Sequence, residues 1–283
     1  MKITAFVDGS IYSQSVCEHT AWAAARIGAT VELLHVLGRR ETASAPSNLS
    51  GAIALGARSS LLEELSELDE QRAKLAQKRG RAILDDAAGM VHLAGVDAVT
   101  TKLRRGDVVE TVAEIEADTD MFVIGKRGEA ADFAKLHLGS NLERVARAST
   151  KPVFVASRAF KPIDKVLVAF DGGASSMKAV DAMARSPLFA GLPVKLLTVG
   201  SDGSDIRRRL EDARATLAAG SIEAEIEIAP GQAEIVIAER VESERFNLLV
   251  MGAYGHSRIR SLIIGSTTTE MLRSCKIPVM LFR

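Results

Sequence analysis

Asn247-Leu-Leu-Val-Met-Gly-Ala-Tyr-Gly255, nine further residues, and then Gly265-Ser-Thr267 form the stretch of sequence that decides the fold of this chain. An apolar run opens the stretch, and a helical pattern that ends near Cys275 follows it. The order strand, glycine-rich loop, helix lets backbone N–H groups and a helix N-terminus converge on an anion, most often a phosphate. The alternative is a structural turn, because glycines at strand ends accept a positive φ.

Length and composition favour a two-domain globular protein. The chain has 283 residues, of which 47% are hydrophobic and 25% charged, and this length suits two domains of ordinary size. Lys plus Arg equals Asp plus Glu, 36 each, so the formal net charge is zero. This balance argues against a nucleic-acid binder that works through a general basic field, but it leaves room for one local phosphate site.

The ends of the chain and its cysteines predict a cytoplasmic protein. Residues 1–8 already have the pattern of a strand, so we expect no secretory signal peptide. No apolar run approaches the roughly 18 residues that a membrane span needs. The two cysteines, Cys17 and Cys275, are far apart and lack metal-ligand spacing, which suits a reducing compartment.

The chain is an internal repeat. The first two matched pairs of segments are both 163 positions apart, and the last two are 127 and 126 positions apart. Duplication with one insertion of about 36 residues in the first copy explains all four pairings. The pairs are 3–10 with 166–173, 33–36 with 196–199, 121–125 with 248–252, and 151–155 with 277–281.

Each copy alternates short apolar runs with longer amphipathic stretches, which predicts an α/β fold. We expect two tandem open parallel-sheet, Rossmann-like domains with helices on both faces and right-handed crossovers, at 1–158 and 164–283. The linker between them is short, so the copies should pack together. In the second copy the predicted strands are 164–170, 193–200, 222–229, 247–252 and 278–282, and the predicted helices are 174–187, 203–219, 231–244 and 262–275.

The first copy contains an insertion near 38–58, rich in Ser, Ala and Gly, which predicts a mobile loop. Residues 59–88 follow it with a helical pattern, and Leu61, Leu65, Leu68 and Leu75 lie along one stripe. Two interpretations remain open. The helix packs on the sheet as an extended crossover, or it projects beyond the domain and binds a partner.

Both copies resemble the universal stress protein domain, and together they resemble the tandem members of that family. The resemblance rests on the Asp that closes the first strand (Asp8, Asp171), on the glycine loop after the fourth strand, and on the Pro-Val that opens the last strand. In the family, the pattern Gly, two residues, Gly, nine residues, Gly, then Ser or Thr marks ATP-binding members. The second copy matches it completely through Gly252, Gly255, Gly265 and Ser266.

The first copy departs from this pattern. It has Gly125 and Gly128, then ten residues instead of nine, then Gly139 and Ser140. Whether this copy binds nucleotide stays open, because carboxylates in the loop would repel phosphate whereas the basic residues would attract it. The acidic residues are Glu129 and Asp132, and the basic ones are Lys126, Arg127, Lys135 and His137.

The resemblance also implies roles for the residues that close the strands of the second copy. Asp171 would contact the nucleotide or its divalent metal, since a carboxylate there can share Mg²⁺ with phosphate oxygens. Alternatively, the Asp171 side chain forms an Asx-turn before the helix at Ser175-Ser176. Val199 would offer backbone groups to an adenine edge, or alternatively it is a buried valine with a purely structural role.

The loop residues would hold the phosphates. Gly252 and Gly255 would let the backbone approach closely, and Gly265-Ser266-Thr267 would form the N-terminus of the last helix, with N–H groups and hydroxyls on the phosphates. His256 and Arg258 would screen phosphate charge or lie solvated on the surface. The other candidate residues give only weak signals for a functional site. We interpret His35 as a core or strand-end residue and both cysteines as buried apolar side chains.

The resulting hypothesis is an ATP-binding universal-stress-type protein that uses Mg²⁺ and acts as a nucleotide-responsive stress or signalling module. A slow ATPase or nucleotidyl-transfer enzyme, and a nucleotide-independent interaction protein using the long helix, are its rivals, with an electron-transfer flavoprotein as a weaker fourth option. No arginine finger or general base for hydrolysis is evident.

In the family the last strand pairs with its counterpart across a dimer interface, so here 153–157 and 279–283 would pair internally as a pseudo-dimer. A further homodimer and an unknown protein partner stay open.

Overall fold

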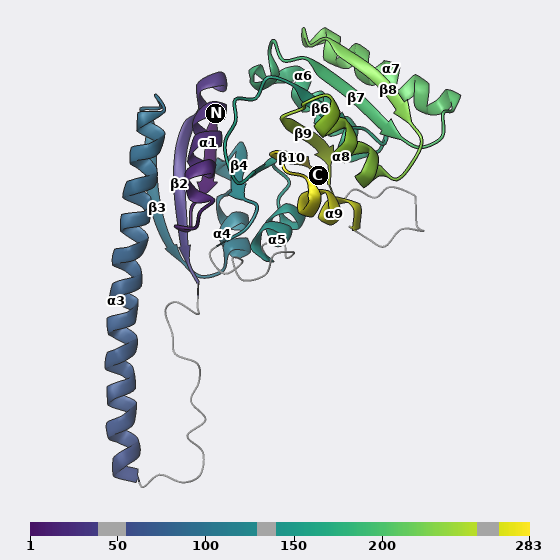
Figure 1. Ribbon diagram of the computed structural model, residues 1–283. Coiled ribbons are helices and arrows are strands. Elements are labelled where there is room, and N and C mark those ends of the chain that lie inside the picture. Colours follow the sequence, from purple (N-terminus) through teal and green to yellow (C-terminus); the bar gives the residue numbers. More distant parts are fainter. Residues whose placement is uncertain (39–54, 129–139, 254–265) are drawn as a thin grey trace.

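The computed structural model describes residues 1–38, 55–128, 140–253 and 266–283 (Figure 1), without the side chains of 55–61, 140, 266 and 267. The first copy forms β1 Lys2–Phe6, α1 Ser13–Ile27, β2 Thr30–Leu37, α3 Leu55–Leu93, β3 Val99–Arg105, α4 Val108–Ile115, η1 Glu116–Asp118, β4 Met121–Gly125, α5 Ser140–Ala148 and β5 Val153–Ala156. The second forms β6 Val166–Ala169, α6 Ala174–Arg185, η3 Pro187–Phe189, β7 Val194–Val199, α7 Ser204–Ala219, β8 Ala224–Ala229, α8 Ala233–Ser243, β9 Leu248–Gly252, α9 Ser266–Ser274 and β10 Val279–Phe282. The expected α/β alternation is confirmed in both copies.

The strands of both copies form one sheet, in the order β3-β2-β1-β4-β5-β10-β9-β6-β7-β8. Among the described strands, neighbours within each copy are parallel, and only β5 and β10 are antiparallel, with Phe154 opposite Met280. The expected internal pairing of the two last strands is therefore present. The central strands read as continuous apolar runs because helices cover both of their faces.

Two apolar cores lie on opposite faces of the sheet, and each runs through both copies. One core gathers side chains from α1, α3, α6 and α7, whereas the other gathers side chains from α4, α5, α8 and α9. The prediction of helices on both faces is confirmed. Because each core is shared, the two copies pack as one molecule.

Side chains also tie the two copies together through backbone carbonyls. The Arg26 Nε of α1 donates to the carbonyl of Leu188, 2.7 Å away. The Lys126 ammonium donates to the carbonyl of Cys275, at the end of α9. Cations near the last carbonyls of a helix are favoured by its dipole, so this contact joins the first copy to a helix end of the second.

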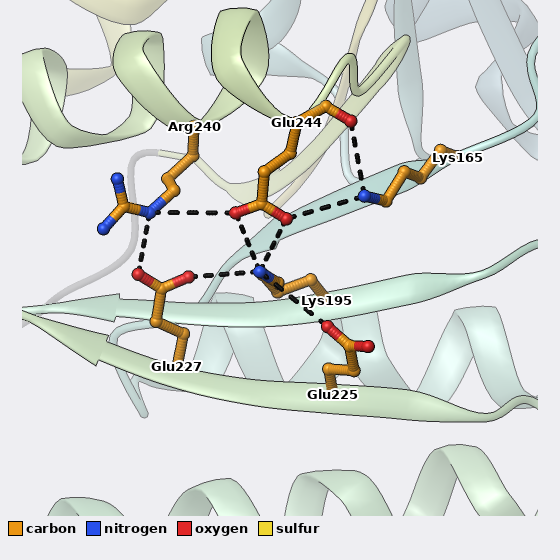
Figure 2. A network of polar contacts seen from close by, with 6 residues as sticks. All are labelled: Lys165, Lys195, Glu225, Glu227, Arg240 and Glu244. Carbon is orange, nitrogen blue, oxygen red and sulfur yellow. Dashed lines mark hydrogen bonds and ion pairs between the residues drawn. The ribbon is translucent and has the colours of Figure 1, made fainter.

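An ion-pair network holds α8 against β7 and β8 (Figure 2). Lys195 lies at its centre, with Nζ 2.6 Å from Glu244 Oε2 and 3.3 Å from Glu227 Oε2. Arg240 Nε lies 2.7 Å from Glu227 Oε1. Lys195 is the second residue of β7, so the network lies toward the amino ends of the strands and is structural in character.

Helix α3 packs on the sheet in one part and projects beyond it in another, and it is longer than predicted. From Gly80 onward it packs on the sheet, with Leu84 and Val91 buried. Residues 62–79 contain no buried side chain, and this part of α3 extends past the end of the sheet (Figure 1). The expected mobile loop of the insertion lies outside the described residues. Among the helices that the structure describes, none is both long and apolar enough to cross a membrane.

Candidate functional site

The turn that follows β6 is organised by Asp171. Its Oδ1 atom accepts hydrogen bonds from the Gly173 N–H, at 2.8 Å, and from the Ser176 hydroxyl, at 2.6 Å. This is the Asx-turn that the sequence left as the alternative interpretation. The carboxylate itself is exposed, so one of its oxygens shapes the turn while the group remains accessible at the end of the strand.

The first copy repeats this turn at Asp8. The Asp8 Oδ1 accepts from the Ser10 N–H, at 3.0 Å, and from the Ser13 hydroxyl, at 3.3 Å. Ser13 and Ser176 are 163 positions apart, as Asp8 and Asp171 are. Sequence reasoning did not assign a site role to this pair of serines. Comparing the residues that follow each Asp by five positions, at the same 163-position offset, would have identified the pair.

Three predicted residues of the second copy end adjacent strands. In the sheet, β6 lies between β9 and β7, so Gly252, Asp171 and Val199 all lie at the carboxyl edge, where ligands bind in open parallel sheets. The chain runs outward from β6 to β7 and returns to the other side of β6 as β9, which makes this the topological switch point. Val199 is half-buried.

Gly252 brings this edge into contact with a helix. A Cβ atom at Gly252 would lie 2.8 Å from the Ser176 backbone nitrogen and 2.9 Å from the Ser175 Cβ. The N-terminus of α6 therefore rests directly on the end of β9. Gly125 occupies the same position in the first copy, where a Cβ would lie 3.0 Å from the Tyr12 Cβ.

The loop after β4 returns to the end of β1. A Cβ at Gly128 would lie 2.9 Å from the Asp8 Oδ2, so the first copy brings together Asp8, Gly125 and Gly128 from its predicted site. Lys126, expected to attract phosphate, instead uses its ammonium on the Cys275 carbonyl, and burial lowers its pKa. The role of Lys126 in attracting phosphate therefore stays a prediction.

Several predicted residues cannot be placed. Gly139, Gly255, His256 and Gly265 lie outside the described residues, as do Glu129, Asp132, Lys135, His137 and Arg258. The backbone shows that α5 begins at Ser140 and α9 at Ser266, so the glycine loop does lead into a helix with Ser266 and Thr267 in its first turn. Their contacts with a ligand remain predictions.

A cation contacts the glycine of the second turn, whereas the matching glycine of the first turn has an apolar neighbour. The Arg209 Nη1 of α7 donates to the Gly172 carbonyl at 2.9 Å, beside Asp171, and its Nε lies 3.0 Å from Asp205 Oδ2. In the first copy the residue against the matching Gly9 is Ile83. The sequence offered no signal for this difference, because the contact joins residues 37 positions apart.

The other titratable groups that the sequence singled out, His35 and the two cysteines, are buried in the protein interior. The buried His35 Nδ1 lies 2.7 Å from the Val7 carbonyl, as a strand-end residue should. Both cysteines are free and buried, and burial raises the pKa of Cys17 to about 12 and also raises that of Cys275. Their interpretation as apolar side chains is confirmed. No cluster of three or more metal-ligating side chains occurs within the described parts of the chain.

Comparison with known proteins gives one consistent family. The model of the "Universal stress protein family" matches residues 1–157 and again 162–283. Universal stress protein Slr1230 of Synechocystis sp. (strain ATCC 27184 / PCC 6803 / Kazusa) is 38% identical over 279 residues, which cover 98% of this chain and 97% of that protein.

Solved structures agree on the fold. A universal stress protein from Archaeoglobus fulgidus DSM 4304 aligns with a TM-score of 0.70 and 22% identity, covering 100% of this chain and 98% of that one. A universal stress protein in complex with cAMP aligns with 44% of this chain and 98% of its own, with a TM-score of 0.36 and 23% identity. The cAMP belongs to the complex of that protein.

Proposed function

Since the chain belongs to the universal stress protein family, with two such domains in tandem, we propose that it binds ATP with Mg²⁺ and acts as a nucleotide-responsive stress or signalling module. The observation that carries this proposal is the placement of Gly252, Asp171 and Val199 at the ends of three adjacent parallel strands. That edge is where open parallel sheets bind ligands. Two free, buried cysteines fit a reducing cytoplasm.

The proposed phosphate site is the loop that ends where α9 begins, at Ser266. A helix N-terminus presents unpaired N–H groups and a positive dipole end to an anion. Gly255, His256, Gly265, Ser266 and Thr267 would therefore hold the phosphates. Asp171 would share Mg²⁺ with phosphate oxygens, since this ion commonly takes one or two carboxylates together with the phosphates of its nucleotide.

We propose the second copy as the principal site for two reasons. Its glycine spacing is complete, and Arg209 adds positive charge at the β6–α6 turn, next to Asp171. Positive charge at the edge favours an anionic ligand. Asp8, Gly125, Gly128, Gly139 and Ser140 would form a weaker site or an inactive one.

The test is calorimetric titration of ATP-Mg²⁺ into nucleotide-stripped full-length protein. We expect one site per chain, lost in Gly265→Asp, because the new carboxylate would repel the phosphates. Gly139→Asp is the matched control, with the same change at the equivalent glycine of the first copy, and it should leave that site intact. Absence of binding at millimolar ATP, or equal binding by both variants and the parent protein, would overturn the proposal.

A second variant tests the charge argument. Arg209→Gln should weaken ATP binding about tenfold, which corresponds to about 1.4 kcal/mol, because it removes the cation beside Asp171. Arg208→Gln is the control: Arg208 is the adjacent exposed arginine and pairs with the same Asp205, at 2.9 Å. Equal affinities of the two variants would mean that Arg209 has no part in the site.

A further inference from the structure

The part of α3 that extends beyond the sheet, residues 62–79, is here called the projecting segment (Figure 1). It contains no buried side chain, although it is helical throughout. Leu62, Leu68 and Leu75 are 50%, 48% and 67% exposed. The segment ends at Gly80, where a Cβ would lie 2.7 Å from the Leu103 Cδ1 on β3, and packing on the sheet begins there.

A helix in this position has little to stabilise it within one chain. Isolated helices of this length are marginal in water, and most helical stability in proteins comes from packing an apolar face. The i,i+4 pair of Glu70 with Lys74, at 2.6 Å, contributes only about 0.3–0.5 kcal/mol. Burying one leucine side chain would contribute about 1.5–3 kcal/mol, so covering the exposed leucines would stabilise the segment far more.

The leucines follow the spacing of a narrow two-helix seam. Leu65 and Leu68 are three positions apart and take the a and d positions of one heptad, and Leu75 takes the d position of the next, whose a position is Arg72. Leu62 flanks this seam at an e position. A seam of this width fits one partner helix better than it fits a sheet, whose contact with a helix needs a wider apolar stripe.

The charges of the projecting segment identify the partner helix. Its first half carries only carboxylates and its second half only cations. Two antiparallel copies would place the acidic half of each beside the basic half of the other, whereas parallel copies would align like charges. The carboxylates are Glu63, Glu64, Glu67, Asp69 and Glu70, and the cations are Arg72, Lys74, Lys78 and Arg79.

We propose that the projecting segments of two chains pair as an antiparallel two-helix coiled coil, which makes the full chain a homodimer about a two-fold axis. In the register that sets Leu65 against Leu75 of the partner subunit, Leu68 lies opposite Arg72 of the partner subunit, and Glu64 faces Lys78 of the partner subunit. Each contact occurs twice, because a two-fold interface is self-complementary. None of the residues proposed to bind nucleotide takes part in this pairing.

The first test is sedimentation equilibrium of the full-length protein over a concentration series. We expect a monomer–dimer equilibrium that Leu75→Lys weakens by at least about tenfold, because a charged residue replaces a seam leucine twice per dimer. The matched control is Leu93→Lys, on the same helix but outside the segment, where the leucine is 91% exposed. A parent protein that stays monomeric throughout, or equal weakening by both variants, would overturn the proposal.

Charge reversal tests the antiparallel register. Glu64→Lys and Lys78→Glu should each weaken dimerisation, and the double variant should restore it. Residues 64 and 78 lie about 21 Å apart along one helix, so mutual rescue can only arise between chains. A double variant that dimerises no better than the single variants contradicts the register.

Cysteine cross-linking tests the same geometry directly. A Leu65→Cys/Leu75→Cys variant should form disulfide-linked dimers on oxidation, whereas Leu65→Cys alone should not. The two positions are about 15 Å apart within a helix, so they cannot bond to each other in one chain, and both native cysteines are buried. Equally efficient cross-linking by Leu65→Cys alone would indicate parallel helices and overturn the antiparallel dimer.

Discussion

At the scale of the residue, Gly252 has a structural reason to be glycine that does not depend on any ligand. The first turn of α6 lies so close that a Cβ there would approach the Ser176 backbone nitrogen to 2.8 Å. The first copy imposes a milder form of the same constraint at Gly125, against Tyr12. A glycine that opens a phosphate-type loop can thus be required by the packing of a neighbouring helix.

We expect Gly252→Ala to lower the free energy of unfolding by about 1–3 kcal/mol, the usual cost of forcing atoms into a packed site. Backbone atoms on α6 can give way less easily than a flexible side chain. Gly89→Ala is the control: a Cβ there meets nothing within 4 Å, and alanine favours the helix by about 1 kcal/mol. Urea denaturation measures both changes. If Gly252→Ala proves as stable as the parent protein but loses ATP, the glycine serves the ligand and not the packing.

At the scale of the element, the ion-pair network of Figure 2 makes the attachment of α8 sensitive to acid. A hydrogen bond from Lys195 holds the pKa of Glu244 below its ordinary value of 4.5. A carboxylate with a lowered folded-state pKa stabilises the fold above the unfolded-state value, and this contribution is lost as the pH falls through the folded-state pKa. Glu244 therefore favours the folded state at neutral pH.

Glu244→Gln should consequently be less stable than the parent protein at pH 7, by about 1 kcal/mol or less given the partial exposure of the pair. The difference should shrink as the pH falls below 4.5, because the parent carboxyl is then protonated too. Urea denaturation at a series of pH values measures the difference. Glu223→Gln, an exposed carboxylate before β8, should leave the curve unchanged. A difference for Glu244→Gln that does not vary with pH would rule out this electrostatic explanation.

The sequence predicted the elements of the second copy well because each strand is a short apolar run and each helix an amphipathic one. The predicted strand 193–200, for example, is observed as β7, Val194–Val199. The leucine stripe of α3 was ambiguous for a physical reason, since the same spacing serves packing on a sheet and on another helix. The contacts of Lys126 and Arg209 could not be read from the sequence, because each joins distant segments.

At the scale of the whole molecule, pairing β5 with β10 leaves only two free edges in the sheet, at β3 and β8. Both edge strands carry charge: β3 contains Lys102, Arg104 and Arg105, and β8 contains Glu225 and Glu227. Charged edges discourage further strand addition. The two copies therefore pair with each other, and the addition of further chains to the edge strands of the sheet is disfavoured.

The joined sheet should hold the molecule together without a continuous chain. A protease site introduced in the linker, at the exposed residues Arg158 and Ala159, should yield two fragments that co-elute at the mass of the uncut protein. The reason is that both apolar cores run through the two copies, while β5 and β10 remain hydrogen-bonded. Size-exclusion chromatography with light scattering measures the mass, and a denaturing gel verifies cleavage. Fragments that separate in native buffer would mean that the linker, and not the shared sheet and cores, keeps the two copies together.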